Sequence, residues 1–182
     1  MTAFISAGHN PQGIKVDPGA VANGLHEADL TVEFRNLVVA ELQERNVTVI
    51  TDKDDERLAD YLKRIQTGNG SVVLEFHFDA AAVSTATGTT SLYGSDADRL
   101  DMAFAKELVD TTSKVLGIKN RGALSEKDSH RGSLGLMREQ GIVSLLEICF
   151  ISNPDDIKAY NANKKALAIK IAEIVERYEN MI

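Results

Sequence analysis

One segment near the end of the chain is apolar almost without interruption. Ile142 to Ile151 reads Ile-Val-Ser-Leu-Leu-Glu-Ile-Cys-Phe-Ile, in which Glu147 is the single acid. A strand of this composition is typical of a sheet that is buried on both faces, with helices packed against it. The segment therefore favours a buried central sheet in an α/β protein.

The rest of the chain alternates between short apolar segments and segments with helical spacing. Strands are expected over Thr2–Ala7, Val47–Thr51, Ser71–Phe76, Ser91–Tyr93 and Ile142–Ile151, and helices over Leu25–Arg45, Asp54–Thr67, Ala97–Leu116 and from Asn153-Pro154 onward. Asn23 is expected to cap the first helix. This alternation predicts parallel pairing with helices on both faces. No internal repeat and no Pro-rich linker marks a second domain, so residues 1–182 are predicted to form one domain.

Charge and hydropathy exclude several classes of function. The formal net charge is −7 and there is no long basic run, so phosphate-mediated binding of nucleic acid is not expected. No segment is apolar over the length that spans a bilayer, so membrane insertion is not expected either. The first residues, Met1 to Gly8, lack a positive region and a long apolar core. We therefore expect no signal peptide and synthesis in the cytoplasm.

Four polar residues are expected to converge at one edge of the predicted sheet. His9 follows the first strand, His77 follows the third, Glu147 lies in the last, and Glu27 falls in the first turn of the first helix. Ligands of open α/β sheets gather at the carboxyl ends of the strands. Glu147 in particular needs a partner or a function, because an unpaired carboxylate inside an apolar strand is costly.

Two histidines and one carboxylate suit a catalytic zinc ion, because three protein ligands leave a fourth position for water. A further carboxylate can then act as the general acid/base. Spacing alone leaves other interpretations open. Glu27 is also explained as a first-turn acid that favours the helix dipole, and His26 is a rival ligand. Asp79 is either a hydrogen-bond partner of a metal-bound histidine or a loop acid. Cys149 is interpreted as a small core side chain, and His130 as an exposed loop residue.

At these residues the sequence resembles the zinc-dependent N-acetylmuramoyl-L-alanine amidases found among bacterial cell-separation enzymes and phage lysins. The Gly-His motif and the Asp-Pro-Gly-Ala turn of that family match Gly8-His9-Asn10 and Asp17-Pro18-Gly19-Ala20. Its His-x-Asn-Ala motif matches His77-Phe-Asp79-Ala80, with Asp in place of Asn. Its closing Val-Glu-x-Gly-Phe-x-Ser-Asn-Pro run matches Leu146 to Pro154, with Cys149 where Gly is usual. The resemblance spans nearly the whole chain, from Gly8 through Asp155.

The resemblance implies a single α/β domain on a twisted, mostly parallel sheet. It implies that His9, Glu27 and His77 are the zinc ligands and that Glu147 is the catalytic acid/base. It further implies a peptidoglycan substrate, cut at the amide between N-acetylmuramic acid and L-alanine. In that reaction Glu147 takes a proton from the attacking water and returns it to the departing amine.

Three rival functions are weighed against this one. The first is a zinc peptidase that cuts within the stem peptide, and the second is a wall-binding module without catalysis, against which the intact Glu147 argues. The third is a structural zinc site, which usually has four ligands rich in Cys, whereas this chain has one Cys. The expected lack of a signal peptide fits a phage or prophage lysin that acts on the wall after release or export. The oligomeric state is not readable from the sequence.

Overall fold

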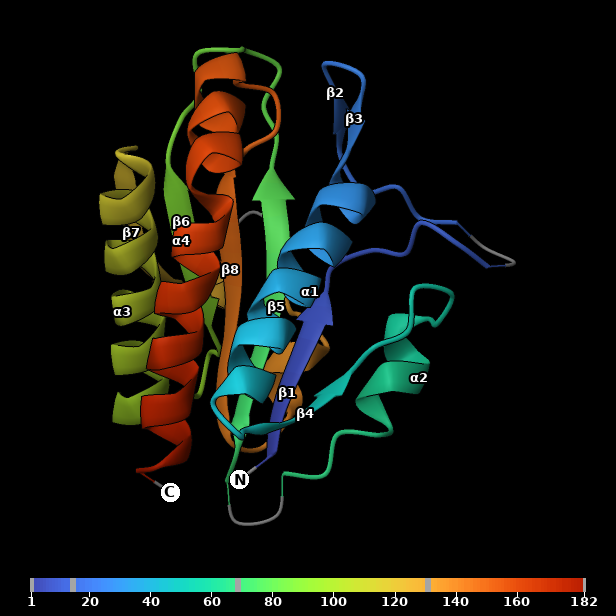
Figure 1. Cartoon of the computed structure of the whole chain (residues 1–182), viewed down its shortest axis with the longest axis vertical. Coiled ribbons are helices and arrows are strands. Elements are labelled where there is room, and N and C mark those ends of the chain that lie inside the picture. The colour runs from blue at the N-terminus through green and yellow to red at the C-terminus, as the bar shows by residue number, and fades with distance from the viewer. Residues whose placement is uncertain (1, 14–15, 68–69, 130–131, 182) are drawn as a thin grey trace.

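Six strands form the main sheet of the protein. The computed structural model describes residues 2–13, 16–67, 70–129 and 132–181 (Figure 1). The strand order is β4-β1-β5-β8-β6-β7. The bounds are β1 Thr2–Ala7, β4 Thr48–Thr51, β5 Val72–Asp79, β6 Thr89–Tyr93, β7 Asn120–Ser125 and β8 Ile142–Phe150. Strands β4, β1, β5 and β8 are mutually parallel, whereas β6 runs antiparallel to β8 and parallel to β7. The predicted mostly parallel sheet is therefore confirmed.

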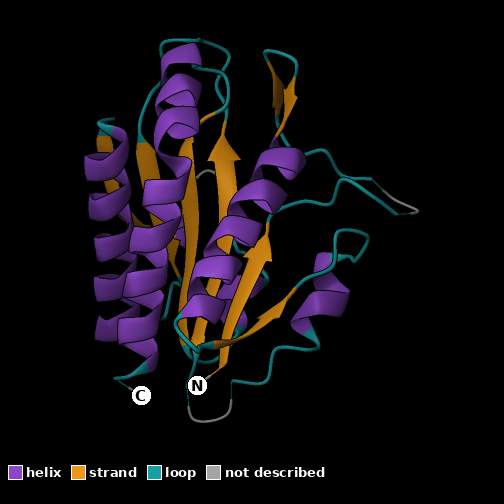
Figure 2. Cartoon of the chain, in the orientation of Figure 1, coloured by secondary structure: helices purple, strands orange, loops and turns teal. Residues whose placement is uncertain are grey.

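Three long helices cover one face of this sheet. They are α1 Glu27–Glu44, α3 Arg99–Leu116 and α4 Pro154–Glu179, and they lie side by side in front of the strands (Figures 1 and 2). Aromatic side chains fill the space between the layers. The ring centroids of Phe34 and Phe76 lie 4.9 Å apart, and those of Phe78 and Tyr160 lie 5.0 Å apart. No helix in the described parts of the chain is long and apolar enough to cross a membrane.

The other face of the sheet carries a smaller core. Here Tyr61 of the short helix α2, Leu58–Leu62, and Leu136 of the 3-10 turn η2, Leu136–Arg138, pack against Phe4 of β1 and Leu145 of β8. The prediction of helices on both faces is confirmed, with one short helix and a turn on this side. The thin cover matters for function, because it leaves room for cavities over the ends of the strands.

The central position of β8 explains the apolar run in the sequence. All nine of its residues are buried, and it pairs with β5 on one side and β6 on the other. The helix that follows begins at Pro154, as predicted, because the side chain of Asn153 accepts hydrogen bonds from the backbone N–H groups of Asp155 and Asp156.

Two expectations about the helices are wrong. The segment 54–67 forms a helix only over Leu58–Leu62, because its flanking side chains make tertiary contacts instead. Asp54 pairs with Arg35 at 2.7 Å, and Arg64 donates to the carbonyl of Thr51 at 2.8 Å. Asn23 does not cap α1, whose N-cap is His26. It lies instead in the turn between the short strands β2, Val21–Ala22, and β3, Leu25–His26, with a φ of 53°.

The strands also differ from expectation at two points. Strand β7 was not expected, because an edge strand with one neighbour needs no apolar run, and its sequence, Asn-Arg-Gly-Ala-Leu-Ser, contains none. Strand β5 extends to Asp79, so His77 lies inside the strand and not after it. This extension places His77 in register with the neighbouring strand β8.

The core between the layers generates a prediction about stability. Phe34 is fully buried against Phe76 and Tyr160, so Phe34→Ala should lower the free energy of unfolding by about 3–5 kcal/mol. Urea denaturation followed by circular dichroism measures the change. Val83→Ala is the control, because Val83 is 61% exposed and should change stability by less than about 0.5 kcal/mol. Equal losses in the two variants would contradict the assigned core.

Candidate metal centre

His9 is positioned by a loop that folds back on itself. It lies two residues beyond β1 in a left-handed backbone conformation with a φ of 67°. After it, the backbone N–H groups of Asn10 and Asp17 each donate to the other residue's carbonyl, at 3.1 and 2.9 Å. This pairing brings Asp17 Oδ2 within 2.9 Å of His9 Nδ1. The other ring nitrogen, Nε2, faces Glu27.

Glu27 is held by two backbone N–H groups. It lies in the first turn of α1, as expected, where it is the first helical residue, and it is 2% exposed. Its Oε2 accepts from the backbone of Ala20 at 2.8 Å, and its Oε1 accepts from the backbone of Phe78 at 3.1 Å. The carboxylate is therefore fixed between the loop before α1 and strand β5.

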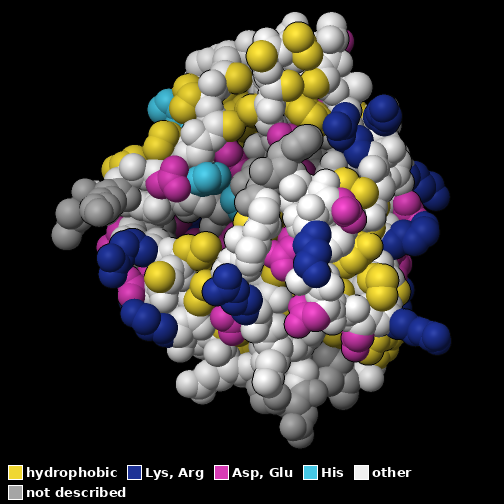
Figure 3. Space-filling model, turned by 180° about the vertical axis from the view of Figure 1, so that it is seen from behind, with side chains coloured by type: hydrophobic (Ala, Val, Ile, Leu, Met, Phe, Trp, Pro, Cys, Tyr) yellow, Lys and Arg dark blue, Asp and Glu magenta, His cyan; other side chains and the backbone are white. Residues whose placement is uncertain are grey.

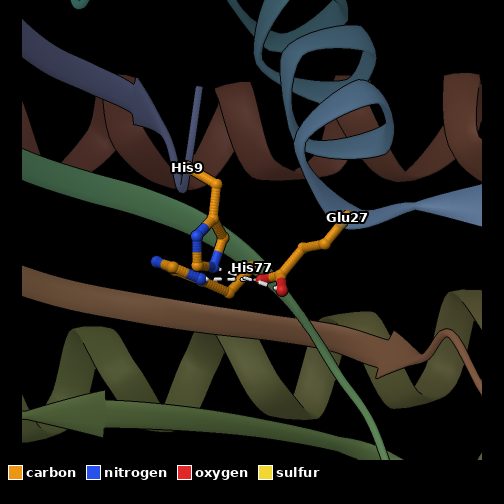
Figure 4. A group of neighbouring side chains, drawn as sticks. All are labelled: His9, Glu27 and His77. Atoms are coloured by element: carbon orange, nitrogen blue, oxygen red, sulfur yellow. Dashed lines mark hydrogen bonds and ion pairs between the residues drawn. The ribbon is translucent and has the colours of Figure 1, made fainter. Parts of the chain in front are cut away.

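The three predicted ligands meet at one point. Nδ1 of His77 lies 2.8 Å from Glu27 Oε1, and Nε2 of His9 lies 3.2 Å from Glu27 Oε2 (Figure 4). The two imidazole rings stand edge to face with their centroids 5.1 Å apart. One ligand atom from each residue lies within 4.8 Å of the others. The predicted convergence of these side chains is thus present in the structure.

A carboxylate stands behind each imidazole. Asp17 contacts the far nitrogen of His9, and Glu75 Oε1 lies 3.0 Å from Nε2 of His77. The second oxygen of Glu75 accepts from the Ser6 hydroxyl at 3.1 Å, which holds Glu75 in place. Such contacts orient a histidine and select its tautomer. Asp79, one of the residues considered for this role, does not fill it, because its Oδ1 accepts from the backbone N–H of Ala80.

The other candidates lie outside this group. The His26 side chain is 54% exposed, and its Nδ1 lies 3.5 Å from Asp29 of the same helix turn. Cys149 is fully buried in the larger core, as expected, and burial raises the pKa of its thiol. His130 lies outside the described residues.

Two glycines make room for the imidazole rings. A Cβ atom on Gly8 would collide with the ring of His77. A Cβ on Gly19 would lie 2.5 Å from the His9 ring and 2.6 Å from Glu27 Oε2, and the φ of 64° at Gly19 also disfavours other residues. The glycines beside His9 and Pro18 are therefore required by packing at the site.

The surrounding carboxylates favour positive charge at this point. Burial alone would raise the pKa of Glu27, but hydrogen bonds with His77 and His9 outweigh it and hold the pKa well below its usual range. Burial alone would lower the pKa of His77, but hydrogen bonds with Glu27 and Glu75 raise it to about 10. The pKa of His9 is also raised, because Glu27 and Asp17 outweigh the effect of burial. A divalent cation bound among the ligand atoms would balance the negative charge of these carboxylates.

The donor set fits a zinc ion. Two imidazole nitrogens and one carboxylate oxygen are the ligands of many catalytic zinc sites. The His9 and His77 nitrogens each lie close to a different oxygen of Glu27, at 3.2 and 2.8 Å, and one donor atom from each residue lies within 4.8 Å of the others. The residues present can thus hold the ion.

Glu147 lies beside this group on the neighbouring strand. It is paired in register with His77, so the two side chains project from the same face of the sheet. It is 4% exposed and lines a cavity of about 380 Å³, whereas His9 and His77 line another cavity, of about 410 Å³. Figure 3 shows the molecule from behind the view of Figure 1, so that this face of the sheet points toward the reader. Histidine and acidic side chains gather there around a hollow.

Asp17 and Glu75 have no role predicted from the sequence. A signal for Glu75 was present, because it interrupts an apolar strand in the same way as Glu147 and lies two residues before His77. Residues at this spacing share one face of a strand. Asp17 offered no comparable signal, since its contact with His9 depends on how the intervening loop closes.

Comparisons with known proteins agree with this architecture. The sequence profile of the N-acetylmuramoyl-L-alanine amidase family matches residues 4–177. An uncharacterised Bacillus subtilis protein, YqiI, is 26% identical over 159 residues, which cover 85% of this chain and 72% of that protein. An amidase structure from Clostridium difficile 630 has a TM-score of 0.82 at 21% identity, covering 98% of this chain and 96% of that one. A putative amidase structure from Neisseria meningitidis has a TM-score of 0.79 at 29% identity, covering 97% and 94%.

The geometry of the centre predicts which histidines are needed for metal. His9→Ala and His77→Ala should each lose most of about one zinc per chain, because two ligands hold the ion poorly. Elemental analysis of the purified variants measures the loss. His26→Ala is the matched control and should keep its zinc. Full zinc content in both ligand variants, or loss in His26→Ala, would show that the ligand set is wrong.

Proposed function

Because the chain belongs to the N-acetylmuramoyl-L-alanine amidase family, we propose that it works with a zinc ion held by His9, Glu27 and His77. The chain is an N-acetylmuramoyl-L-alanine amidase, which hydrolyses the amide between N-acetylmuramic acid and L-alanine of peptidoglycan. The observation that best supports the metal is the convergence of these three side chains within 4.8 Å. Residues 1–182 act as one catalytic domain in this proposal.

Glu147 is the general acid/base in this proposal. A bound zinc ion supplies Lewis-acid activation of water and of the amide carbonyl. Glu147 accepts the proton of the attacking water as the new C–O bond forms. It then donates that proton to the amide nitrogen as the C–N bond breaks, so that L-alanine leaves as a free amine.

The position of Glu147 supports this role. The carboxylate lies in register with His77, on the same face of the sheet. Its strand is held from the other side by the Thr89 hydroxyl, which donates to the backbone carbonyl of Glu147 at 2.8 Å. The acid is therefore carried by a strand that is paired on both sides rather than by a loop, which keeps it at a constant position relative to His77.

A substitution at Glu147 separates binding from chemistry. Glu147→Gln is nearly isosteric but cannot accept a proton, so turnover should fall on the order of a hundredfold or more. Zinc content and the thermal unfolding midpoint should stay close to those of the unchanged protein. Glu44→Gln, at the exposed end of α1, is the control and should keep full activity. Near-normal turnover in Glu147→Gln would rule out the proposed role.

The products of digestion distinguish the amidase from its rivals. Mass spectrometry of digested peptidoglycan should show stem peptides with a free N-terminal alanine and intact glycan strands. No new reducing ends should appear, because cleavage of the glycan usually needs two carboxylates that flank an acetal. A chelator should stop the reaction until zinc is restored. Stem peptides cut internally would indicate a zinc peptidase, and no cleavage at all would indicate a binding module.

The biological setting is a separate question from the reaction. A role as a phage or prophage lysin stays a prediction, as does the route by which the protein reaches the wall. Neither affects the assignments of His9, Glu27, His77 and Glu147, which rest on the geometry of the site.

A further inference from the structure

We propose that the stem peptide extends from the scissile amide toward β7, where Arg121, assisted by Lys119, binds a carboxylate on the residue that follows L-alanine. The inference rests on the proposed function, because it takes Glu147 as the acid that protonates the departing amine. It assigns a direction to the substrate and a chemical class, an acidic peptide, to one of the two cavities.

The two cavities lie on opposite sides of the His77–Glu147 pair. The first, of about 410 Å³, is lined by His9, His77 and residues of β1 and α2. The second, of about 380 Å³, is lined by Glu147, Thr90 and Arg121, from β8, β6 and β7. They have no lining residue in common, and both volumes suit a small ligand.

This arrangement sets the direction of the amide. The proposed chemistry places the carbonyl over the group of His9, Glu27 and His77, and the nitrogen next to Glu147, which protonates it. The acyl part of the substrate, the muramic acid, then lies over the first cavity. The amine part, the stem peptide, continues over the second.

Sheet geometry brings Arg121 within reach of the second residue of the peptide. Thr90 is paired with Glu147, while its neighbours Thr89 and Ser91 are paired with Asn120 and Ala123 of β7. Arg121 therefore lies at the level of Glu147, two strands away, a separation of roughly 10 Å. An extended peptide advances about 3.5 Å per residue, so a carboxylate on the second residue lies about 7 Å from the amide nitrogen. The side chain of Arg121 is long enough to cover the distance that remains between β7 and that carboxylate.

Arg121 is held in place and keeps donors for a ligand. Its guanidinium lies 5.1 Å above the ring of Phe150, and its Nη1 is 3.4 Å from the carbonyl of Thr87. Within the described parts of the chain, neither Arg121 nor Lys119 has an acidic partner within 4.0 Å, although Asp79 and Asp128 line the same cavity. A guanidinium can bind a carboxylate through two parallel hydrogen bonds. Figure 3 shows basic side chains on the β7 side of this face.

The first cavity is less suited to an acidic peptide than the second. Its lining includes the carboxylates of Asp17, Asp52 and Glu75. Its single arginine, Arg57, is already paired with Asp60 at 2.8 Å. Among the described residues, the lining of the first cavity has four carboxylates and one arginine, whereas that of the second has three carboxylates and two basic side chains. The balance of charge therefore favours an acidic group on the side of β7, in agreement with the direction derived from Glu147.

A binding experiment without turnover tests the proposal. In the zinc-loaded Glu147→Gln protein, isothermal titration calorimetry gives dissociation constants for N-acetylmuramoyl-L-alanyl-D-glutamate and for the same compound with its α-carboxylate converted to an amide. The acid should bind more tightly than the amide. Adding Arg121→Gln should reduce this preference by about tenfold, the effect of one hydrogen bond to a charged group. Arg121→Lys should keep part of the preference, because it keeps the charge.

Matched variants make the result specific. Arg99→Gln, at the start of α3 on the other face of the sheet, should leave both constants unchanged. Lys119→Gln should lower the preference to a smaller extent, and it supplies the test if Arg121→Gln does not fold. The inference is overturned if both Arg121→Gln and Lys119→Gln keep the full preference for the acid over the amide. It is also overturned if Arg57→Gln removes that preference. Either result leaves the proposed function standing, because that is judged by cleavage of peptidoglycan by the unchanged protein.

Discussion

The buried carboxylate of Glu27 is the contact on which the rest of the site depends. Its two oxygens accept from the backbones of Ala20 and Phe78, and each also faces one histidine. A buried charge costs several kcal/mol unless its hydrogen-bonding capacity is used, and here both oxygens have two polar neighbours. Because these neighbours come from the loop after β1, from the loop before α1 and from β5, the carboxylate joins three separate segments of the chain.

Negative charge is distributed unevenly around the ligand atoms. Asp17 and Glu75 stand behind the histidines, and they raise the pKa of His9 and His77 respectively, together with Glu27 and against the effect of burial. Carboxylates so placed increase the basicity of the imidazoles and their hold on a cation. On the far side of Glu147 the side chains of Lys119 and Arg121 line the cavity instead. A protein with a net charge of −7 thus presents basic groups at one end of its site.

The parts of the fold that were predictable are those whose burial requires a recognisable amino-acid composition. Strand β8 is enclosed on both faces, so its apolar run identified it, and the Asn153-Pro154 start of α4 followed from local capping chemistry. Strand β7 was missed because an edge strand needs no such run. Helix α2 was expected to be longer because its apolar spacing was visible, whereas the ion pair between Arg35 and Asp54, 19 residues apart, was not.

The sequence by itself determined the kind of sheet, the motifs that indicate the family, and the four side chains proposed for metal and proton transfer, because residue type and order carry that information. Only the tertiary structure decided which groups support them. It placed Asp17 and Glu75 behind the histidines, left His26 outside the ligand group, gave Asp79 a backbone partner in place of a histidine, and set Glu147 beside His77. The physical reason is that these relations depend on loop closure and strand register, which bring together atoms from residues up to 70 positions apart, as in the pair of His77 and Glu147.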